Sequence, residues 1–281
     1  MLWGYAGPWF GEFLQGDDSL MGRLRWLVGN GLRAAHVGLG EVGRMTDAER
    51  EALGEYLVEH DLRLVPGVHF DFLDPDHDAV MRRTDEAIRG LGEYHALLRA
   101  PIVTTLVGKY HRFMRDPSLQ EQLDRLPSVI APIAYACHEF GCPLGIENHG
   151  DYYATDLVDL CRRTPFLSLF LDTGNTYLIG EQSLPAIRAA APLTIGTHFK
   201  DHHVRPEKQT YPLRFEIGGA VLGEGDVGLR EAYDILVETA PDPTALVMLI
   251  EMIPPRPMGP EECLAKTLAF VRSLEHPGSR L

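Results

Sequence analysis

The sequence predicts a single (β/α)8 barrel, a TIM barrel, over residues 1–281. The chain has 281 residues, close to the roughly 250 of a typical barrel. Short apolar runs rich in β-formers alternate with amphipathic stretches, a pattern typical of parallel βαβ units. No linker or low-complexity block divides the sequence into two halves. These three observations favour one α/β domain.

Eight apolar runs have the length and composition of strands. They begin near Leu2, Leu32, Leu62, Ile102, Pro143, Phe166, Thr194 and Ala245. Eight parallel strands can close a sheet into a barrel. The competing architecture is an open doubly wound sheet, which predicts a glycine-rich phosphate turn after the first strand. Gly4, Gly7 and Gly11 do not have the spacing of that turn.

Between these runs, apolar residues recur at the spacing of amphipathic helices, so a helix is predicted in each stretch. One helix is expected to open with Thr46, because Glu49 follows three residues later and the two form the pattern of a capping box. Longer irregular connections are expected near residues 66–78, 108–116 and 202–227, each after a strand. Barrels build their active sites at that end of the strands.

Composition and charge exclude several classes of protein. The 40 acidic and 26 basic residues give a formal charge of −14, which counts against a nucleic-acid or anionic-membrane binder. The N-terminus lacks a signal-peptide pattern, and no apolar run is long enough to span a bilayer. The four cysteines show no CxxC pairing, which favours reduced thiols. We therefore expect a cytoplasmic protein with neither a nucleic-acid nor a membrane partner.

Polar residues stand where the last four strands end. One βα unit separates each from the next, and they are Glu147, Asp172, His198 and Glu251. Neighbouring strand ends share one barrel mouth, so these side chains are expected to converge. Converging carboxylates are costly to bury unless a cation offsets them. Three carboxylates and one imidazole suit a single divalent ion, namely Mn²⁺, Mg²⁺, Co²⁺ or Zn²⁺. The alternative for each acid is a surface position or an ion pair with Lys200 or Arg256.

Several motifs resemble those of the xylose-isomerase-like superfamily. They are GIENHG at 145–150, LDTGN at 171–175, HFKD at 198–201, GEGDV at 223–227 and IEM at 250–252. The resemblance covers nearly the whole chain. That superfamily comprises sugar isomerase and epimerase barrels and includes ketose 3-epimerases, inosose dehydratase, 3-dehydroshikimate dehydratase and endonuclease IV. The resemblance implies that Glu147, Asp172, His198 and Glu251 are the metal ligands.

The resemblance also implies catalytic roles. Glu147 and Glu251 match the two glutamates that act on opposite substrate faces in ketose 3-epimerases, so both are candidate acid/base residues as well as ligands. His149 is an alternative base, because it stands two residues beyond Glu147 on the same side of an extended strand. The other interpretation of His149 is a hydrogen-bond donor behind the ligands. Asn175 departs from the family pattern, since many relatives carry a histidine there that contacts substrate or metal.

Five residues are candidate substrate contacts. Lys200 lies two residues after His198 and could hold a developing oxyanion or a substrate anion, or form a salt bridge to Asp201 or Glu224. The others are His69, Lys109, Asn175 and Arg205. The sequence does not distinguish phosphorylated from free sugars, because the candidate anion contacts Lys109, Lys200, Arg205, Arg214 and Arg256 lie in loops. GEGDV predicts a tight turn in which Asp226 caps the next helix.

The leading hypothesis is a divalent-metal-dependent isomerase or epimerase of a small sugar or related polyhydroxy carbonyl compound. It would act by proton abstraction and an enediolate. The alternative is a metal-dependent dehydratase or lyase acting on a keto-cyclitol or a dehydroshikimate-like compound. An endonuclease IV-like enzyme is less favoured: His36, His69 and His111 would supply its further ligands, but the charge opposes DNA binding. A catalytically silent sugar-binding barrel is the remaining alternative. Such barrels often associate, so a homo-oligomer stays open.

Overall fold

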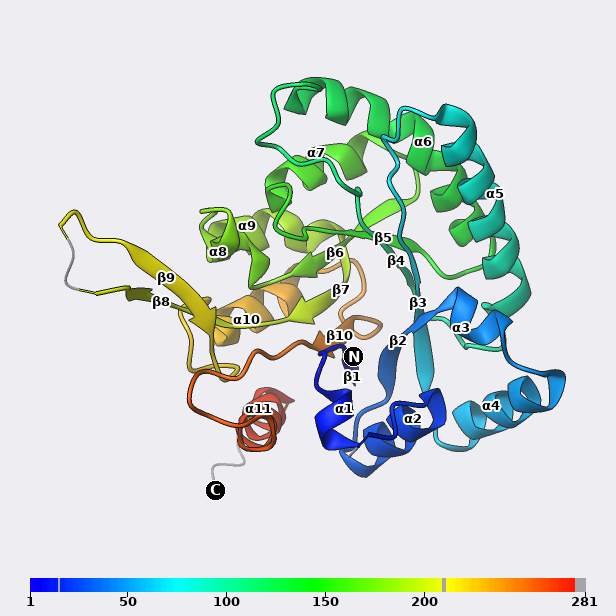
Figure 1. The fold of residues 1–281 in the computed structure, drawn as a ribbon, viewed down its shortest axis with the longest axis horizontal. Helices are drawn as coiled ribbons and strands as arrows, with labels where there is room; N and C mark the ends of the chain where they lie inside the picture. The colour runs from blue at the N-terminus through cyan, green and yellow to red at the C-terminus, as the bar shows by residue number, and fades with distance from the viewer. Residues whose placement is uncertain (15, 209–210, 276–281) are drawn as a thin grey trace.

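The computed structural model describes residues 1–14, 16–208 and 211–275 and contains a closed barrel of eight parallel strands (Figure 1). The order around the barrel is β1-β10-β7-β6-β5-β4-β3-β2. The barrel strands are β1 (Leu2–Tyr5), β2 (Ala34–Gly38), β3 (Arg63–Val68), β4 (Val103–Thr105), β5 (Leu144–Glu147), β6 (Leu167–Asp172), β7 (Thr194–Phe199) and β10 (Val247–Ile250). Each predicted run contains one of them, so the predicted fold class is confirmed.

Helices connect the strands and cover the outside of the barrel (Figure 1). They are α1 (Phe10–Phe13), α2 (Leu20–Gly29), α3 (Leu39–Gly43), α4 (Asp47–Glu59), α5 (His77–Tyr94), α6 (Leu119–Glu139), α7 (Ala154–Arg163), α8 (Asn175–Leu178), α9 (Ser183–Ala190), the short 3₁₀ helix η1 (Ala191–Leu193), α10 (Leu229–Thr239) and α11 (Pro260–Glu275). The predicted capping box at α4 is confirmed. The Thr46 hydroxyl accepts from the Glu49 N–H at 3.3 Å, and the Glu49 carboxylate accepts from the Thr46 N–H at 2.7 Å.

Apolar side chains close the barrel interior below its mouth. They come from five of the strands and from the residue that precedes β4, and are Leu2, Ala34, Val65, Ile102, Phe170, Val247 and Leu249. Intervening residues face the helices instead, as Met248 and Ile250 of β10 do. Successive strand residues point to opposite sides of a sheet. A residue two positions beyond this interior layer therefore points into the barrel mouth.

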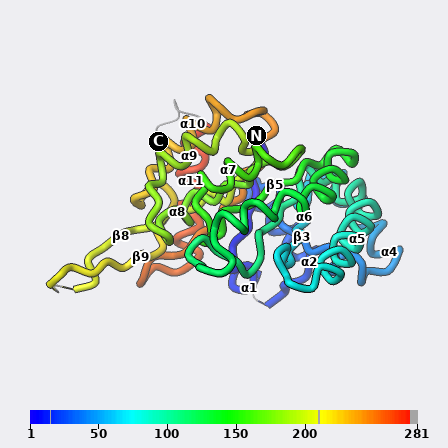
Figure 2. The backbone as a smooth tube through the Cα atoms, turned by 90° about the horizontal axis from the view of Figure 1, so that it is seen from above, coloured from blue at the N-terminus to red at the C-terminus, as the bar shows by residue number. Residues whose placement is uncertain are grey.

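A two-stranded antiparallel sheet follows β7. Strand β8 (His202–Pro206) pairs with β9 (Phe215–Gly219), and Figures 1 and 2 show this hairpin extending away from the barrel. The expectation of an irregular connection over 202–227 was therefore wrong for these strands. Pro206 on β8 and charged residues on both strands, such as Arg205 and Glu216, hide the alternation that marks a hairpin. Residues 209–210 of this connection lie outside the described part of the chain.

The other two expected long connections also follow barrel strands. Residues 69–76 lead from β3 to α5, and residues 106–118 lead from β4 to α6. Both start at the ends of the strands where the polar residues stand. All four cysteines are buried and unbonded. None of the helices within the described ranges is long and apolar enough to cross a membrane.

Candidate functional site

The four residues predicted as a metal set stand at equivalent places in the barrel. Glu147 and Asp172 end β5 and β6, His198 is the penultimate residue of β7, and Glu251 directly follows β10. Asp172 and Glu251 each come two residues after a side chain of the interior layer, Phe170 and Leu249. The two-residue period of a strand therefore turns these acids into the mouth.

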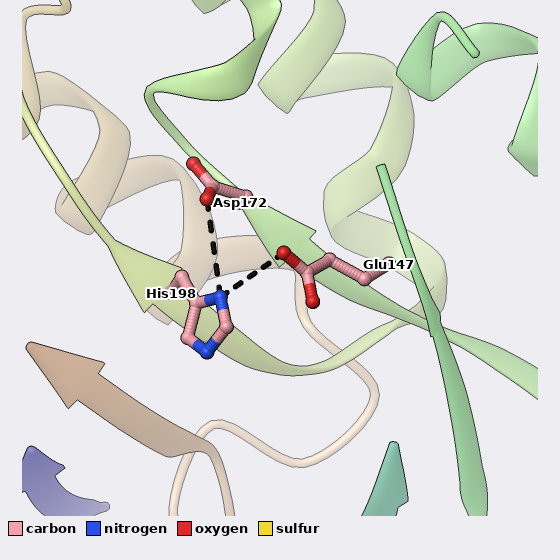
Figure 3. Close-up of side chains that lie close together, drawn as sticks. All are labelled: Glu147, Asp172 and His198. Carbon is pink, nitrogen blue, oxygen red and sulfur yellow. Dashed lines mark hydrogen bonds and ion pairs between the residues drawn. The ribbon is translucent and has the colours of Figure 1, made fainter. Parts of the chain in front are cut away.

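The imidazole of His198 lies at the centre of this set. Its Nδ1 is 3.1 Å from Glu147 Oε1, 3.1 Å from Glu251 Oε2 and 3.8 Å from Asp172 Oδ2. Figure 3 shows the Glu147 and Asp172 carboxylates directed at this nitrogen. One possible ligand atom from each of Glu147, Asp172 and His198 lies within 4.8 Å of the other two. Donor atoms about 2.1 Å from one cation are themselves about 3–4 Å apart, so this spacing fits a shared ion.

The carboxylates of the set are buried, so their ionised forms need nearby positive charge to be stable. Burial raises the pKa of Asp172 to about 6, although Lys200 opposes the shift. Burial would lower the pKa of His198, but the three carboxylates around it outweigh burial and raise that pKa to about 9. His198 in turn outweighs the effect of burial on Glu147 and lowers its pKa to about 2. Without a metal, a protonated His198 therefore supplies the positive charge that stabilises the carboxylates. A bound divalent ion could supply that charge instead.

A second histidine holds the ring of His198. His36 of β2 places its Nε2 2.8 Å from Nε2 of His198 and its Nδ1 3.3 Å from the Val65 carbonyl oxygen. A carbonyl can only accept, so Nδ1 of His36 donates to it. Burial lowers the pKa of His36 to about 3, which leaves its Nε2 as an acceptor for the Nε2–H of His198. This arrangement directs Nδ1 of His198 toward the carboxylates, as a ligating histidine requires.

Lys200 is the cation that lies among these acids. It is 7% exposed, and its Nζ lies 2.8 Å from Glu251 Oε1 and 3.4 Å from Asp172 Oδ2. The two carboxylates outweigh burial and raise the pKa of Lys200. Its ion pairs are thus made with the proposed ligands and not with Asp201 or Glu224. Lys200 Nζ also donates to Asn175 Oδ1 at 3.3 Å.

Two buried asparagines fix the ends of β5 and β6. The Asn148 side chain donates to the Asp172 carbonyl at 2.9 Å and accepts from the Asp172 N–H at 2.8 Å. Asn175 Nδ2 donates to the Asn148 carbonyl at 3.0 Å. Asp172 Oδ1 accepts from the N–H groups of Gly174 and Asn175, at 2.8 and 2.9 Å. Asp172 Oδ2 is therefore the oxygen that faces the site.

The Asp201 carboxylate joins the HFKD and GEGDV motifs. It accepts from the backbone N–H groups of Gly223, Gly225 and Val227 at 2.9, 3.1 and 3.2 Å. A Cβ at Gly225 would lie 2.2 Å from Asp201 Oδ1, so only glycine fits there. The predicted Asp226 cap was wrong. Gly228, with φ of 79°, precedes α10, while the Asp226 carboxylate accepts from the Val204 N–H at 2.7 Å.

The other predicted site residues occupy different places around the mouth. His149 is exposed, but it is close enough for its charge to favour the ionised form of Glu147. His69 and His36 line one pocket of about 240 Å³. Lys109 lies on another pocket, 3.8 Å from Asp71 Oδ2, and makes no contact with the carboxylates of the set. Arg205 of β8 lines a third pocket, which Lys200 also lines.

His36 and Asn148 belong to this site but were not predicted as parts of it. His36 was considered only as a ligand in a multi-metal enzyme. Its signal in the sequence is its place two residues after the interior residue Ala34, which directs it into the mouth. Asn148 carries no signal in a single sequence, because its hydrogen bonds are made to the backbone of a different strand.

Comparisons with known proteins agree with this architecture. A family model described as a xylose isomerase-like TIM barrel matches residues 26–274. A D-psicose 3-epimerase with D-tagatose from Clostridium cellulolyticum H10 has a TM-score of 0.71 and 14% identity, with 98% of each chain covered. A xylose isomerase-like TIM barrel protein from Mycobacterium smegmatis in complex with magnesium has a TM-score of 0.66 and 14% identity, covering 96% of this chain and 95% of that one.

A third similar structure is the probable 3-DHS dehydratase AsbF of Bacillus anthracis, involved in petrobactin synthesis. Its TM-score is 0.65 and its identity 13%, with 97% of this chain and 98% of that chain covered. At these identities the structural likeness establishes the fold alone. No curated protein matches the sequence.

Proposed function

This chain belongs to the xylose isomerase-like TIM barrel family, and we propose that it is a divalent-metal-dependent isomerase or epimerase of a small sugar or related polyhydroxy carbonyl compound. The observation that carries the proposal is the position of His198 Nδ1 among the carboxylates of Glu147, Asp172 and Glu251. Solved structures of similar fold include a D-psicose 3-epimerase and a magnesium complex, which agree with such a role.

The proposed metal ligands are Glu147, Asp172, His198 and Glu251. When bound, the ion would polarise the substrate carbonyl and stabilise the negative charge that develops on its oxygen. Neighbouring residues orient the ligand atoms toward the site. Lys200 binds Glu251 Oε1, which leaves Oε2 toward the site, and His36 orients the ring of His198.

The two glutamates reach the site from well-separated strands. Glu147 ends β5 and Glu251 follows β10, with β6 and β7 between them. We infer that one carboxylate removes the proton from the carbon next to the carbonyl, which gives an enediolate. The other glutamate, acting as a protonated carboxyl group, returns a proton to the opposite face, and the stereocentre is inverted. Return of the proton to the neighbouring carbon gives an isomer instead.

Proton exchange in D₂O tests this function. We expect the Mn²⁺-loaded protein to incorporate deuterium into one member of a panel of ketoses, with substrate and product of otherwise equal mass. Removal of metal with a chelator should abolish the exchange, and added Mn²⁺ should restore it. Glu147→Gln should lower the rate by roughly 10²–10⁴-fold. Glu139→Gln, at an exposed position on α6, is the matched control. Exchange that survives chelation would contradict the proposal.

A dehydratase is the second candidate, favoured by His149. This histidine stands two residues beyond Glu147 and influences its charge, so it could serve as a separate base. Loss of a β-hydroxyl would then follow the same C–H abstraction. With inososes and 3-dehydroshikimate, dehydration would release water and give a product of lower mass. A His149→Ala variant that keeps full activity would count against this route.

A further inference from the structure

A large pocket opens beside the proposed metal site. It has a volume of about 710 Å³ and lies between the base of the β8–β9 hairpin and residues 253–256, which follow β10. Figure 1 shows the hairpin and the segment after β10 on the same side of the barrel. Lys200 lines the pocket, and its Nζ contacts Glu251 and Asp172. Lys200 therefore borders both the pocket and the proposed metal site.

The lining of this pocket is positively charged, although the chain has a formal charge of −14. Its lining contains three basic side chains, those of Lys200, Arg205 and Arg256, and one carboxylate, that of Glu216. Arg205 lies opposite Glu216 in the register of the hairpin. Within the described residues, neither Arg205 nor Arg256 takes part in an ion pair, with Glu216 or with any other acid. Both guanidinium groups are thus available to a ligand.

His202 adds a buried nitrogen that lacks a partner. The residue is 3% exposed and lines the same pocket. Its Nδ1 lies 3.2 Å from the Gly218 carbonyl oxygen, to which it donates, while its Nε2 is buried without a hydrogen-bond partner. Leaving such an atom unpaired costs free energy. Because Nδ1 carries the ring proton, Nε2 can only accept, so a ligand hydroxyl that donates to it, and not an anionic oxygen, would satisfy it.

We propose that this pocket binds an anionic group of the substrate, a phosphate or a carboxylate, between Arg205 and Arg256. The proposal rests on the proposed function, because it assumes that the reacting carbonyl lies at the metal site. Arginine suits this task, since its planar guanidinium forms paired hydrogen bonds with two oxygens of one phosphate or carboxylate. The two arginines come from different segments, β8 and the chain after β10, and both line this one pocket.

Binding measurements with matched ligands test the proposal. We would titrate Mn²⁺-loaded protein with D-ribulose, D-ribulose 5-phosphate, inorganic phosphate and D-gluconate. We expect at least one of the phosphorylated or carboxylated ligands to bind more tightly than D-ribulose by about tenfold or more. Preference for D-ribulose 5-phosphate would identify phosphate as the group, and preference for D-gluconate would identify carboxylate.

Arginine variants locate the effect. Arg205→Ala with Arg256→Ala should abolish the preference for the charged ligand over D-ribulose. Both residues are exposed, so the double variant should fold. Arg214→Ala is the matched control, because Arg214 belongs to the same connection and is exposed but does not line the pocket. It should keep the preference.

Two outcomes would overturn the proposal. One is equal affinity for neutral and charged ligands, and the other is an equal loss in the Arg214→Ala control. Failure of the proposed function would look different. If D₂O exchange is absent from every ketose but the preference still depends on Arg205 and Arg256, the anion pocket stands without the isomerase. If metal-dependent exchange occurs on neutral ketoses without preference for anions, the isomerase stands without the anion pocket.

Discussion

Three of the four proposed ligands use their second polar atom to bind a neighbour. Asp172 Oδ1 accepts two backbone N–H groups, Glu251 Oε1 pairs with Lys200, and Nε2 of His198 meets His36. The other polar atoms, Asp172 Oδ2, Glu251 Oε2 and His198 Nδ1, are directed at one another. Such fixed ligand orientation lowers the cost of binding a metal, because fewer side chains must be ordered on binding.

His36 should control metal affinity without being a ligand. We expect His36→Ala to weaken Mn²⁺ binding by about 10–100-fold, because the ring of His198 would lose the acceptor that orients it. Calorimetric titration of the metal-free protein with Mn²⁺ measures this. His36→Gln provides a side-chain oxygen that can accept from Nε2 of His198, so it should recover part of the affinity. Unchanged affinity in His36→Ala would show that the contact does not position the ligand.

Metal affinity should depend on pH through His198. The folded pKa of this residue, about 9, lies above its ordinary 6.5, so its proton stabilises the metal-free fold fully below pH 6.5. That contribution is lost as the pH rises through about 9. A metal ion must displace the same proton. We therefore expect Mn²⁺ affinity to rise by up to about tenfold per pH unit between pH 6.5 and about 9, and then to level off.

Proton release provides a direct check of this linkage. Titrations at one pH in buffers of different ionisation enthalpy should show about one proton released per metal ion. A pH-independent affinity over this range, with no proton released, would mean that His198 is not a ligand.

At the scale of elements, the sequence predicted the features that depend on residues close together in the chain. The eight barrel strands and the capping box of Thr46 and Glu49 depend on apolar runs and on residues three apart, and both could be predicted. The hairpin could not, because Pro206 and the charged residues around it mask its alternation. Asp226 was assigned to the wrong helix cap, because its carboxylate binds the N–H of Val204 in β8, a contact that depends on tertiary structure.

The same distinction applies to the candidate site. Glu147, Asp172, His198 and Glu251 could be selected because each follows an apolar strand, and the structure brings them together. The position of His36 two residues after Ala34 directs it into the mouth, but this spacing does not show that it contacts His198. The spacing of apolar residues does not indicate where an arginine side chain in a long connection points. The position of Arg205 on the charged pocket could therefore be seen only in the structure.

Asp201 should stabilise the turn between β9 and α10. Asp201→Ala would leave the N–H groups of Gly223, Gly225 and Val227 without their acceptor. We expect the free energy of unfolding to fall by about 2–3 kcal/mol, measured by urea denaturation. Asp85→Ala, on the exposed face of α5, is the control and should change it little. Equal effects of the two substitutions would contradict the structural role of Asp201.

At the scale of the whole molecule, a bound cation should stabilise the fold. The set brings three carboxylates together at the mouth of a chain whose formal charge is −14. An ion that binds only the folded state, at a concentration of about 100 Kd, adds about 2.7 kcal/mol to the free energy of unfolding. We expect the Tm to rise by roughly 2–4 °C per kcal/mol when Mn²⁺ is added to chelator-treated protein.

A ligand variant shows whether this stabilisation comes from the proposed site. Asp172→Asn removes one carboxylate from the set and should lose most of the increase in Tm that Mn²⁺ produces. Glu139→Gln, remote from the set, should retain it. An equal increase in all three proteins would place the stabilising ion elsewhere on the surface.

The position of β1 has a consequence for how the protein is made. Leu2 pairs with Val247 and Gly4 pairs with Ala34, so the first strand lies between β2 and the last barrel strand. A ribosome completes β1 first and β10 last. One edge of β1 therefore stays unpaired until the last barrel strand has been synthesised, and such long-range pairing is slow and leaves the edge open to wrong partners. Since Glu251 follows β10, the four proposed ligands can come together only after the last barrel strand has been made.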